Sequence, residues 1–165
     1  MRNRNKILIY SVLTLAIMIA IFMFSGQNGE QSVDMSNSFL VTIIGRILEK
    51  ILPPLTGNGF EADIREYAHM FEFGCLGISM SLLCREIIRK RRWLAFVVSE
   101  LGCFLYACTD EFHQTFVPGR VGTFADVGVD AVGFTIAVIL VAIVEASVHI
   151  KQKCTDTENK EKNQL

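Results

Sequence analysis

The sequence predicts an all-α protein, a four-helix transmembrane bundle, and three observations lead to this prediction. Hydrophobic residues make up 51% of the 165 residues, and the mean hydropathy of +0.38 is too high for a soluble domain of this length. Four stretches are long and apolar enough to cross a hydrocarbon layer about 30 Å thick. Lysine and arginine gather in the segments that would lie on one side of these stretches.

The four predicted spans leave no room for a separate soluble domain, so any chemistry must lie in or at the membrane. They run from Ile7 to Phe24, from Tyr67 to Cys84, from Trp93 to Cys108 and from Phe124 to Val148. The first is expected to remain as an anchor, because no small-x-small cleavage site follows it. Residues 1–150 therefore form one predicted transmembrane domain, and the polar tail 151–165 is predicted to be disordered and cytoplasmic.

A shorter amphipathic pattern lies between the first and second spans. Apolar residues recur at helical spacing from Phe39 to Leu52, and Pro53-Pro54 ends the pattern. The stretch is too short to cross a membrane. We expect a short amphipathic interfacial or re-entrant helix here, with a helix packed against the bundle as the alternative.

The basic residues predict the orientation in the membrane. They occupy residues 1–6, the connection 85–92 and the tail after residue 150, which all lie on one side of a four-span topology. Because short basic segments stay in the cytoplasm, both termini are predicted to be cytoplasmic. The segments 25–66 and 112–123 then lie outside.

Ten polar side chains lie within or at the edge of the predicted spans, where an ionisable group is costly unless it pairs, binds or reacts. They are His69, Glu72, Glu100, Asp110, Glu111, His113, Gln114, Arg120, Asp126 and Asp130. Within each span they recur at helical spacing, and the topology places all but Glu100 near the outer ends of the helices. We interpret them as one site. For Glu100 alone, hydrogen bonding that holds helices together is the favoured role.

The sequence Val117-Pro118-Gly119-Arg120 has the composition of a tight turn, since proline presets the first central dihedral angle and glycine accepts a positive φ at the second. Such a turn would aim Arg120 back over the helix ends. There its guanidinium could bind carboxylates of the protein, or a phosphate or carboxylate of a ligand.

Charge balance constrains the site. Its five carboxyl groups face one arginine and two histidines, so either some carboxyls are protonated or a cation is bound. The candidate acid/base residues are Glu111, His113 and Asp126. The candidate binding residues are His69, Glu72, Asp110, Gln114, Arg120 and Asp130. No spacing matches a strong metal motif and no cofactor is predicted, so a bound cation and purely structural hydrogen bonding both stay open.

Three separated motifs carry a family resemblance. Residues 106–120 contain D-E-x-H-Q-x-F-x-P-G-R, residues 124–133 contain D-x-x-x-D-x-x-G, and residues 68–77 contain H-x-F-E-F-x-x-L-G. Together with Phe24-Ser25-Gly26-Gln27, and in this order, they resemble the VanZ-like family of small bacterial membrane proteins. Two departures are Asp130, where the family often has asparagine, and Phe73, where tyrosine is common.

The resemblance implies a multi-pass protein of the bacterial cytoplasmic membrane, associated with the cell envelope, and one named member of the family confers low-level resistance to teicoplanin. It implies no reaction. The partners expected from it are membrane lipid and a lipid-linked or lipoglycopeptide ligand, and no nucleic acid. The oligomeric state stays open.

Three functions follow as hypotheses. The favoured one is a cell-envelope protein that binds or modifies a lipid-linked or lipoglycopeptide ligand at an outer-leaflet acidic pocket. The second is an intramembrane acid/base hydrolase or transferase, which the absence of a nucleophile motif such as G-x-S-x-G weakens. The third is a proton-coupled transporter, the least favoured because the chain shows no internal repeat.

Overall fold

The computed structural model describes residues 4–27 and 60–162, with side chains described for 4–27 and 66–155. The described chain contains four helices and no strand, which confirms the all-α prediction. The helices are α1 (Arg4–Ser25), α4 (Phe60–Ile87), α5 (Arg92–Gln114) and α6 (Phe124–Lys162).

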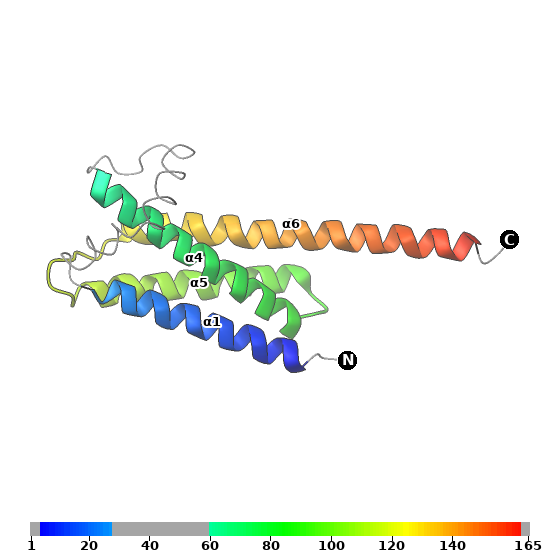
Figure 1. The fold of residues 1–165 in the computed structure, drawn as a ribbon, viewed down its shortest axis with the longest axis horizontal. Coiled ribbons are helices and arrows are strands. Elements are labelled where there is room, and N and C mark those ends of the chain that lie inside the picture. The colour runs from blue at the N-terminus through cyan, green and yellow to red at the C-terminus, as the bar shows by residue number, and fades with distance from the viewer. Residues whose placement is uncertain (1–3, 28–59, 163–165) are drawn as a thin grey trace.

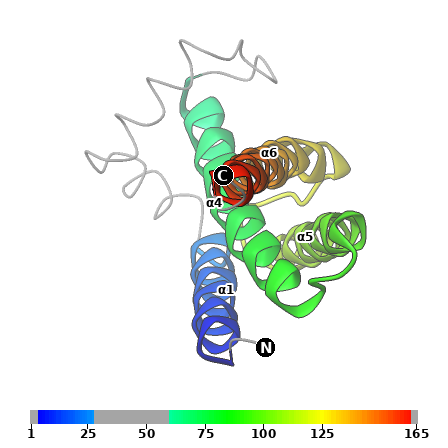
Figure 2. The same cartoon turned by 90° about the vertical axis from the view of Figure 1, so that its right-hand side faces the viewer.

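The four helices form one elongated bundle in which α4 is central (Figures 1 and 2). It packs against each of the other three helices, and α5 also packs against α6. The beginning of α1, the α4–α5 connection and the end of α6 lie toward one end of the bundle, and the α5–α6 connection lies at the other (Figure 1). We call the first the basic end, after Lys6, Arg85, Arg89 and Arg92, and the second the polar end.

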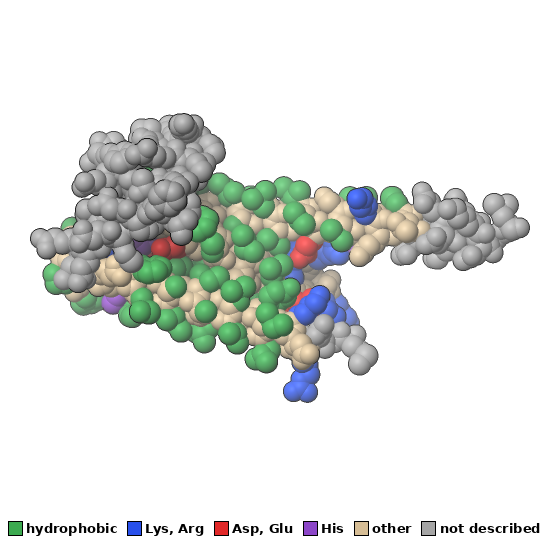
Figure 3. Space-filling view, viewed as in Figure 1, with side chains coloured by type: hydrophobic (Ala, Val, Ile, Leu, Met, Phe, Trp, Pro, Cys, Tyr) green, Lys and Arg blue, Asp and Glu red, His purple; other side chains and the backbone are tan. Residues whose placement is uncertain are grey.

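All four helices are long and apolar enough to cross a membrane, so the chain is a multi-pass membrane protein. Each of the four predicted spans is confirmed as part of one helix. Hydrophobic side chains cover the middle of the bundle surface (Figure 3). The helix α1 is apolar on nearly all sides, and of its described residues only Thr14, Ile21 and Ser25 are buried. The remaining surface of α1 is therefore suited to lipid.

Glycines allow α4 and α6 to cross closely. A Cβ atom added at Gly133 would overlap the backbone carbonyl oxygen of Met70, and one added at Gly77 would lie 2.8 Å from the carbonyl oxygen of Phe134. Small residues at helix crossings are typical of membrane bundles, because packing replaces the hydrophobic driving force that lipid removes. The crossing at Gly133 therefore fixes the position of α6 against α4 one helical turn after Asp130.

A stripe of small residues on α5 faces the bundle interior, and its members are Ala95, Ser99, Cys103 and Ala107. The Tyr106 hydroxyl donates a hydrogen bond of 2.5 Å to the Met18 carbonyl oxygen and so joins α5 to α1. At the basic end, Arg85 and Glu145 form an ion pair that joins α4 to α6. The buried stripe continues toward the polar end as Asp110, Glu111 and Gln114, so the interior changes from apolar to polar along one helix face.

Two predictions about the remaining segments have different outcomes. The amphipathic pattern from Phe39 to Leu52 lies outside the described residues. The tail predicted to be disordered differs from the structure over residues 151–162, where α6 continues without a break. This segment contains no glycine or proline, and seven of its twelve residues are lysine, glutamate or glutamine, which favour helix, so the helix of the membrane span can propagate into it.

Candidate functional site

The α5–α6 connection is built around the predicted tight turn, which is confirmed. The backbone N–H of Arg120 donates a hydrogen bond of 3.1 Å to the Val117 carbonyl oxygen. Gly119 has a φ of 80°, the positive value that the third residue of a type II turn requires. The turn reverses the chain at the end of α5 and returns it toward the bundle.

Arg120 then points back into the polar end, as the turn predicts. Its side chain is buried, and one terminal nitrogen donates a hydrogen bond of 3.4 Å to the side-chain oxygen of Gln114. The other terminal nitrogen donates a hydrogen bond of 3.4 Å to the Phe24 carbonyl oxygen at the end of α1. The guanidinium thereby connects the last turns of α1 and α5 and places a positive charge among the buried acids.

Asp110 is the acceptor of a second group of hydrogen bonds at this end. The Ser25 hydroxyl donates to Asp110 Oδ2 over 2.8 Å, and Gln114 Nε2 donates to the same oxygen over 3.0 Å. Gln114 Nε2 also lies 3.1 Å from Glu111 Oε1. The Gln114 amide therefore bonds both carboxylates through its nitrogen and Arg120 through its oxygen.

Glu111 fastens the beginning of α6 to the end of α5. The backbone N–H of Thr123 donates a hydrogen bond of 3.0 Å to Glu111 Oε2. The Thr123 hydroxyl in turn accepts a hydrogen bond of 3.3 Å from the backbone N–H of Asp126, as an N-cap residue does. A Cβ atom at Gly122 would overlap the Glu111 carbonyl oxygen, so glycine is needed for this close approach.

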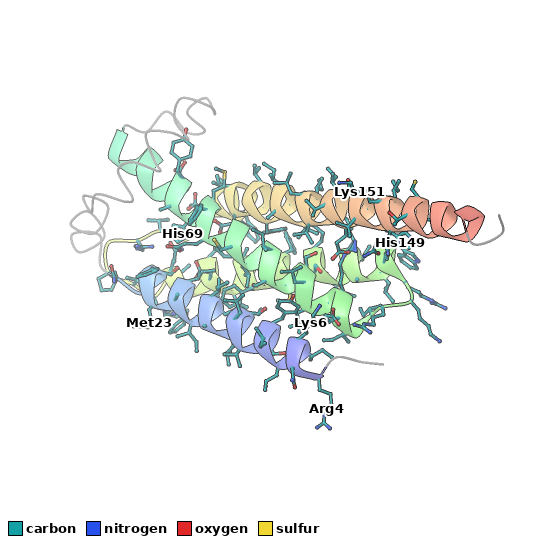
Figure 4. All side chains as sticks on the ribbon, turned by 45° about the vertical axis from the view of Figure 1, so that its right-hand side comes forward. Arg4, Lys6, Met23, His69, His149 and Lys151 are labelled. Carbon is teal, nitrogen blue, oxygen red and sulfur yellow. The ribbon has the colours of Figure 1, made fainter. Side chains whose placement is uncertain are left out.

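Side chains from α4, α5 and α6 line a small cavity beside this network. They are Glu66, His69, Glu111, Gln114, Asp126, Val129 and Asp130. The centre of a sphere as large as a water molecule can occupy a volume of about 10 Å³ in this cavity. The cavity therefore has room for about one water molecule. Figure 4 places His69 on α4 at the polar end, far from Lys6 at the basic end.

Three buried carboxyl oxygens at this end accept no hydrogen bond from any described residue, and they belong to Asp110, Asp130 and Glu72. Asp130 is 1% exposed, and its Oδ2 atom is buried without a partner. Glu72 Oε2, one turn along α4 from His69, is in the same situation. A buried polar atom without a hydrogen-bond partner is costly, so these atoms mark where the site is chemically incomplete.

The structure brings together most residues that the sequence assigned to the site. His69, Glu111, Gln114, Asp126 and Asp130 line one cavity. Asp110 and Arg120 lie behind it in the hydrogen-bonded network, and Glu72 is one turn away on α4.

His113 and Glu100 lie elsewhere. The His113 ring stacks on Phe22 of α1, with ring centroids 4.2 Å apart, and is not among the side chains that line the cavity. Glu100 accepts a hydrogen bond of 3.0 Å from Thr135 and joins α5 to α6, as favoured from the sequence.

Three further residues belong to the site. Ser25 and Thr123 donate to the two carboxylates of α5, and Glu66 lines the cavity. Glu66 precedes His69 by three residues, a helical spacing that could have indicated it. Ser25 belongs to the Phe24-Ser25-Gly26-Gln27 motif, which could have indicated it, whereas Thr123 is a small polar residue before a helix and carries no comparable signal. Among the described residues, no three histidine, cysteine, aspartate or glutamate side chains are arranged to hold a metal ion.

A comparison with protein families extends these observations. The family model described as VanZ/LLP1 matches residues 10–145, which include most of α1, all of α4 and α5, the turn at Arg120 and the part of α6 that lines the cavity. Comparisons with curated proteins and with solved structures gave no match.

Proposed function

Because the chain belongs to the VanZ/LLP1 family, we propose that it is a cell-envelope protein of the bacterial cytoplasmic membrane whose polar end faces outward and binds a lipid-linked or lipoglycopeptide ligand. In this proposal both termini are cytoplasmic. The distribution of charge supports the orientation, because lysine and arginine gather at the basic end (Figure 3) and basic segments remain in the cytoplasm.

One observation carries the proposal of a binding site. The Asp130 carboxylate is buried without a partner in a cavity that acids from three helices line. Polar groups that hold membrane helices together normally bond one another at least in part, as Thr135 bonds one oxygen of Glu100, whose other oxygen is also buried without a partner but lines no described cavity. An unsatisfied carboxylate beside a cavity is better explained by a group that binds there.

The exposed apolar surface at the polar end supports an amphipathic ligand. Large apolar side chains are exposed along the α5–α6 connection, and they are Phe112, Phe116, Val121 and Phe124, of which Phe124 is 90% exposed. Phe112 and Phe116 pack edge to face with centroids 5.1 Å apart. The cavity is too small for a whole sugar or peptide. The proposed ligand therefore inserts one small polar group and lays its apolar part on these side chains.

Susceptibility to teicoplanin tests the proposal. Deletion of the gene is expected to shift the inhibition curve, and the wild-type gene is expected to restore it. Asp126→Asn is expected not to restore it, because the amide removes a negative charge from the cavity. Glu86→Gln, which changes a carboxylate at the basic end, serves as a matched control and is expected to restore the curve. Identical curves with and without the gene would contradict the proposed role.

An acid/base enzyme is the second candidate, and one observation favours it: His69, Glu111 and Asp126 share a cavity that can hold a water molecule. His69 would then take the part that the sequence assigned to His113, which stacks on Phe22. Turnover of a lipid-linked substrate by the purified protein, lost in Glu111→Gln, would support this candidate. Turnover that persists in Glu111→Gln would contradict this candidate function.

A further inference from the structure

We propose that the cavity at the polar end receives a primary ammonium group, so that the ligand is an amine-bearing molecule whose –NH₃⁺ pairs with Asp130. This inference rests on the proposed function, because it names the part of the envelope ligand that enters the site. The size of the cavity, the charge of its lining and an unsatisfied acceptor support it.

The size of the cavity limits what can enter. The cavity holds a group about as large as one water molecule, because the centre of a water-sized sphere can occupy only about 10 Å³ in it. A primary ammonium is a single nitrogen atom with three hydrogen-bond donors and has similar dimensions. A planar guanidinium or a quaternary ammonium is larger than this space.

The charge of the lining selects a cation. Four carboxyl groups line the cavity, from Glu66, Glu111, Asp126 and Asp130, and among the described lining residues His69 is the one basic side chain. Arg120 does not line the cavity and directs its terminal nitrogens to Gln114 and Phe24. A concave acidic lining in a low-dielectric surrounding attracts positive charge more strongly than the same acids would in water.

The hydrogen bonds already present identify the acceptor. Glu111 accepts from Gln114 through one oxygen and from the Thr123 N–H through the other. Asp130, in contrast, has a buried Oδ2 that accepts no hydrogen bond from the described residues. A charge-assisted hydrogen bond from an ammonium group would satisfy this oxygen and stabilise the ionised form of the carboxyl group.

Geometry favours an ammonium over a metal ion. A calcium ion needs six to eight oxygen ligands at about 2.3–2.6 Å. Among the described residues, no group of three metal-ligating side chains is arranged for this. An ammonium group is satisfied by about three acceptors at longer hydrogen-bond distances, which a single carboxylate and its neighbours can supply.

Thermal stability of the full-length protein in detergent micelles tests the inference. Methylammonium chloride is expected to raise the midpoint by several degrees, and tetramethylammonium chloride at equal ionic strength is not. Phosphatidylethanolamine in mixed micelles is expected to act in the same way, and its N-acetyl derivative is not. The first pair tests whether the cavity binds an ammonium group, and the second tests whether a lipid headgroup can supply it.

Substitution at the acceptor completes the test. Asp130→Asn keeps the shape of the side chain and is expected to weaken the apparent affinity for methylammonium by about tenfold or more, the loss expected for a charge-assisted hydrogen bond. Glu86→Gln at the basic end is expected to keep the shift. Equal stabilisation by tetramethylammonium, an unchanged response of Asp130→Asn, or stronger stabilisation by calcium chloride would each overturn the ammonium site.

Failure of this inference is distinguishable from failure of the proposed function. If phosphatidylethanolamine and its N-acetyl derivative stabilise the protein equally, the ligand site remains and the ammonium inference is overturned. If methylammonium stabilises the protein through Asp130 while no lipid and no teicoplanin does, the ammonium site is supported and the proposed envelope ligand is wrong.

Discussion

Replacing Gln114 with methionine is expected to destabilise the protein by about 2–4 kcal/mol, since the change removes three hydrogen bonds among buried groups, two of them to carboxylates. Methionine has a similar length and volume, so packing changes little and the loss reports on the amide. The consequence extends beyond one helix, because the same amide connects Asp110 and Glu111 to Arg120, whose guanidinium also bonds the end of α1.

The thermal midpoint in detergent measures this effect against a matched control. Gln152 lies exposed on α6, and Gln152→Met is expected to leave the midpoint nearly unchanged. If both variants melt together, Gln114 does not organise the polar end, and the carboxylates must be held in place by other contacts.

A substitution at the α4–α6 crossing is expected to have the second large effect. In Gly133→Ala the new methyl group would overlap the Met70 carbonyl oxygen, which belongs to the backbone and can move only with α4. Overpacking of this kind costs about 1–3 kcal/mol. The strain also lies close to Asp130, three residues earlier on the same helix, so the response to methylammonium is expected to weaken as well.

Gly128→Ala is the matched control, because a Cβ atom at Gly128 meets nothing within 4 Å. Alanine favours a helix over glycine by up to about 1 kcal/mol, so this variant is expected to be as stable as the wild type or more so. The thermal midpoints of the two variants separate steric overlap from helix propensity. Equal midpoints would show that the two helices do not cross closely at Gly133.

Much of the site follows from local rules that the sequence obeys. Hydropathy and charge predict the four spans, and helical spacing places Asp126 and Asp130 on one face of α6. The turn at Gly119 and the return of Arg120 toward the helix ends follow from turn chemistry alone. These predictions succeed because each depends only on residues close in the sequence.

The parts that the sequence does not predict depend on how one helix is rotated against another. His113 lies two residues after Glu111, a separation that turns it toward α1 and Phe22 rather than the cavity. The partnership of Ser25 with Asp110 joins residues 85 positions apart, and no local pattern specifies it. The helix α6 continues past Val148 because the membrane span before it is already helical, and extending a helix costs less than starting one. A prediction of disorder from composition alone leaves out this effect.

The central claim is that the acidic cavity lies at the outward-facing end of the bundle. Labelling of single cysteines with a membrane-impermeant maleimide in intact cells tests it most directly, in a background where the five native cysteines are replaced. Val121→Cys and Lys90→Cys place a thiol at exposed positions of the polar and basic ends. The account predicts that the cysteine at position 121 reacts in intact cells and that the one at position 90 reacts only after permeabilisation. The opposite pattern would contradict it and remove the basis for an envelope ligand.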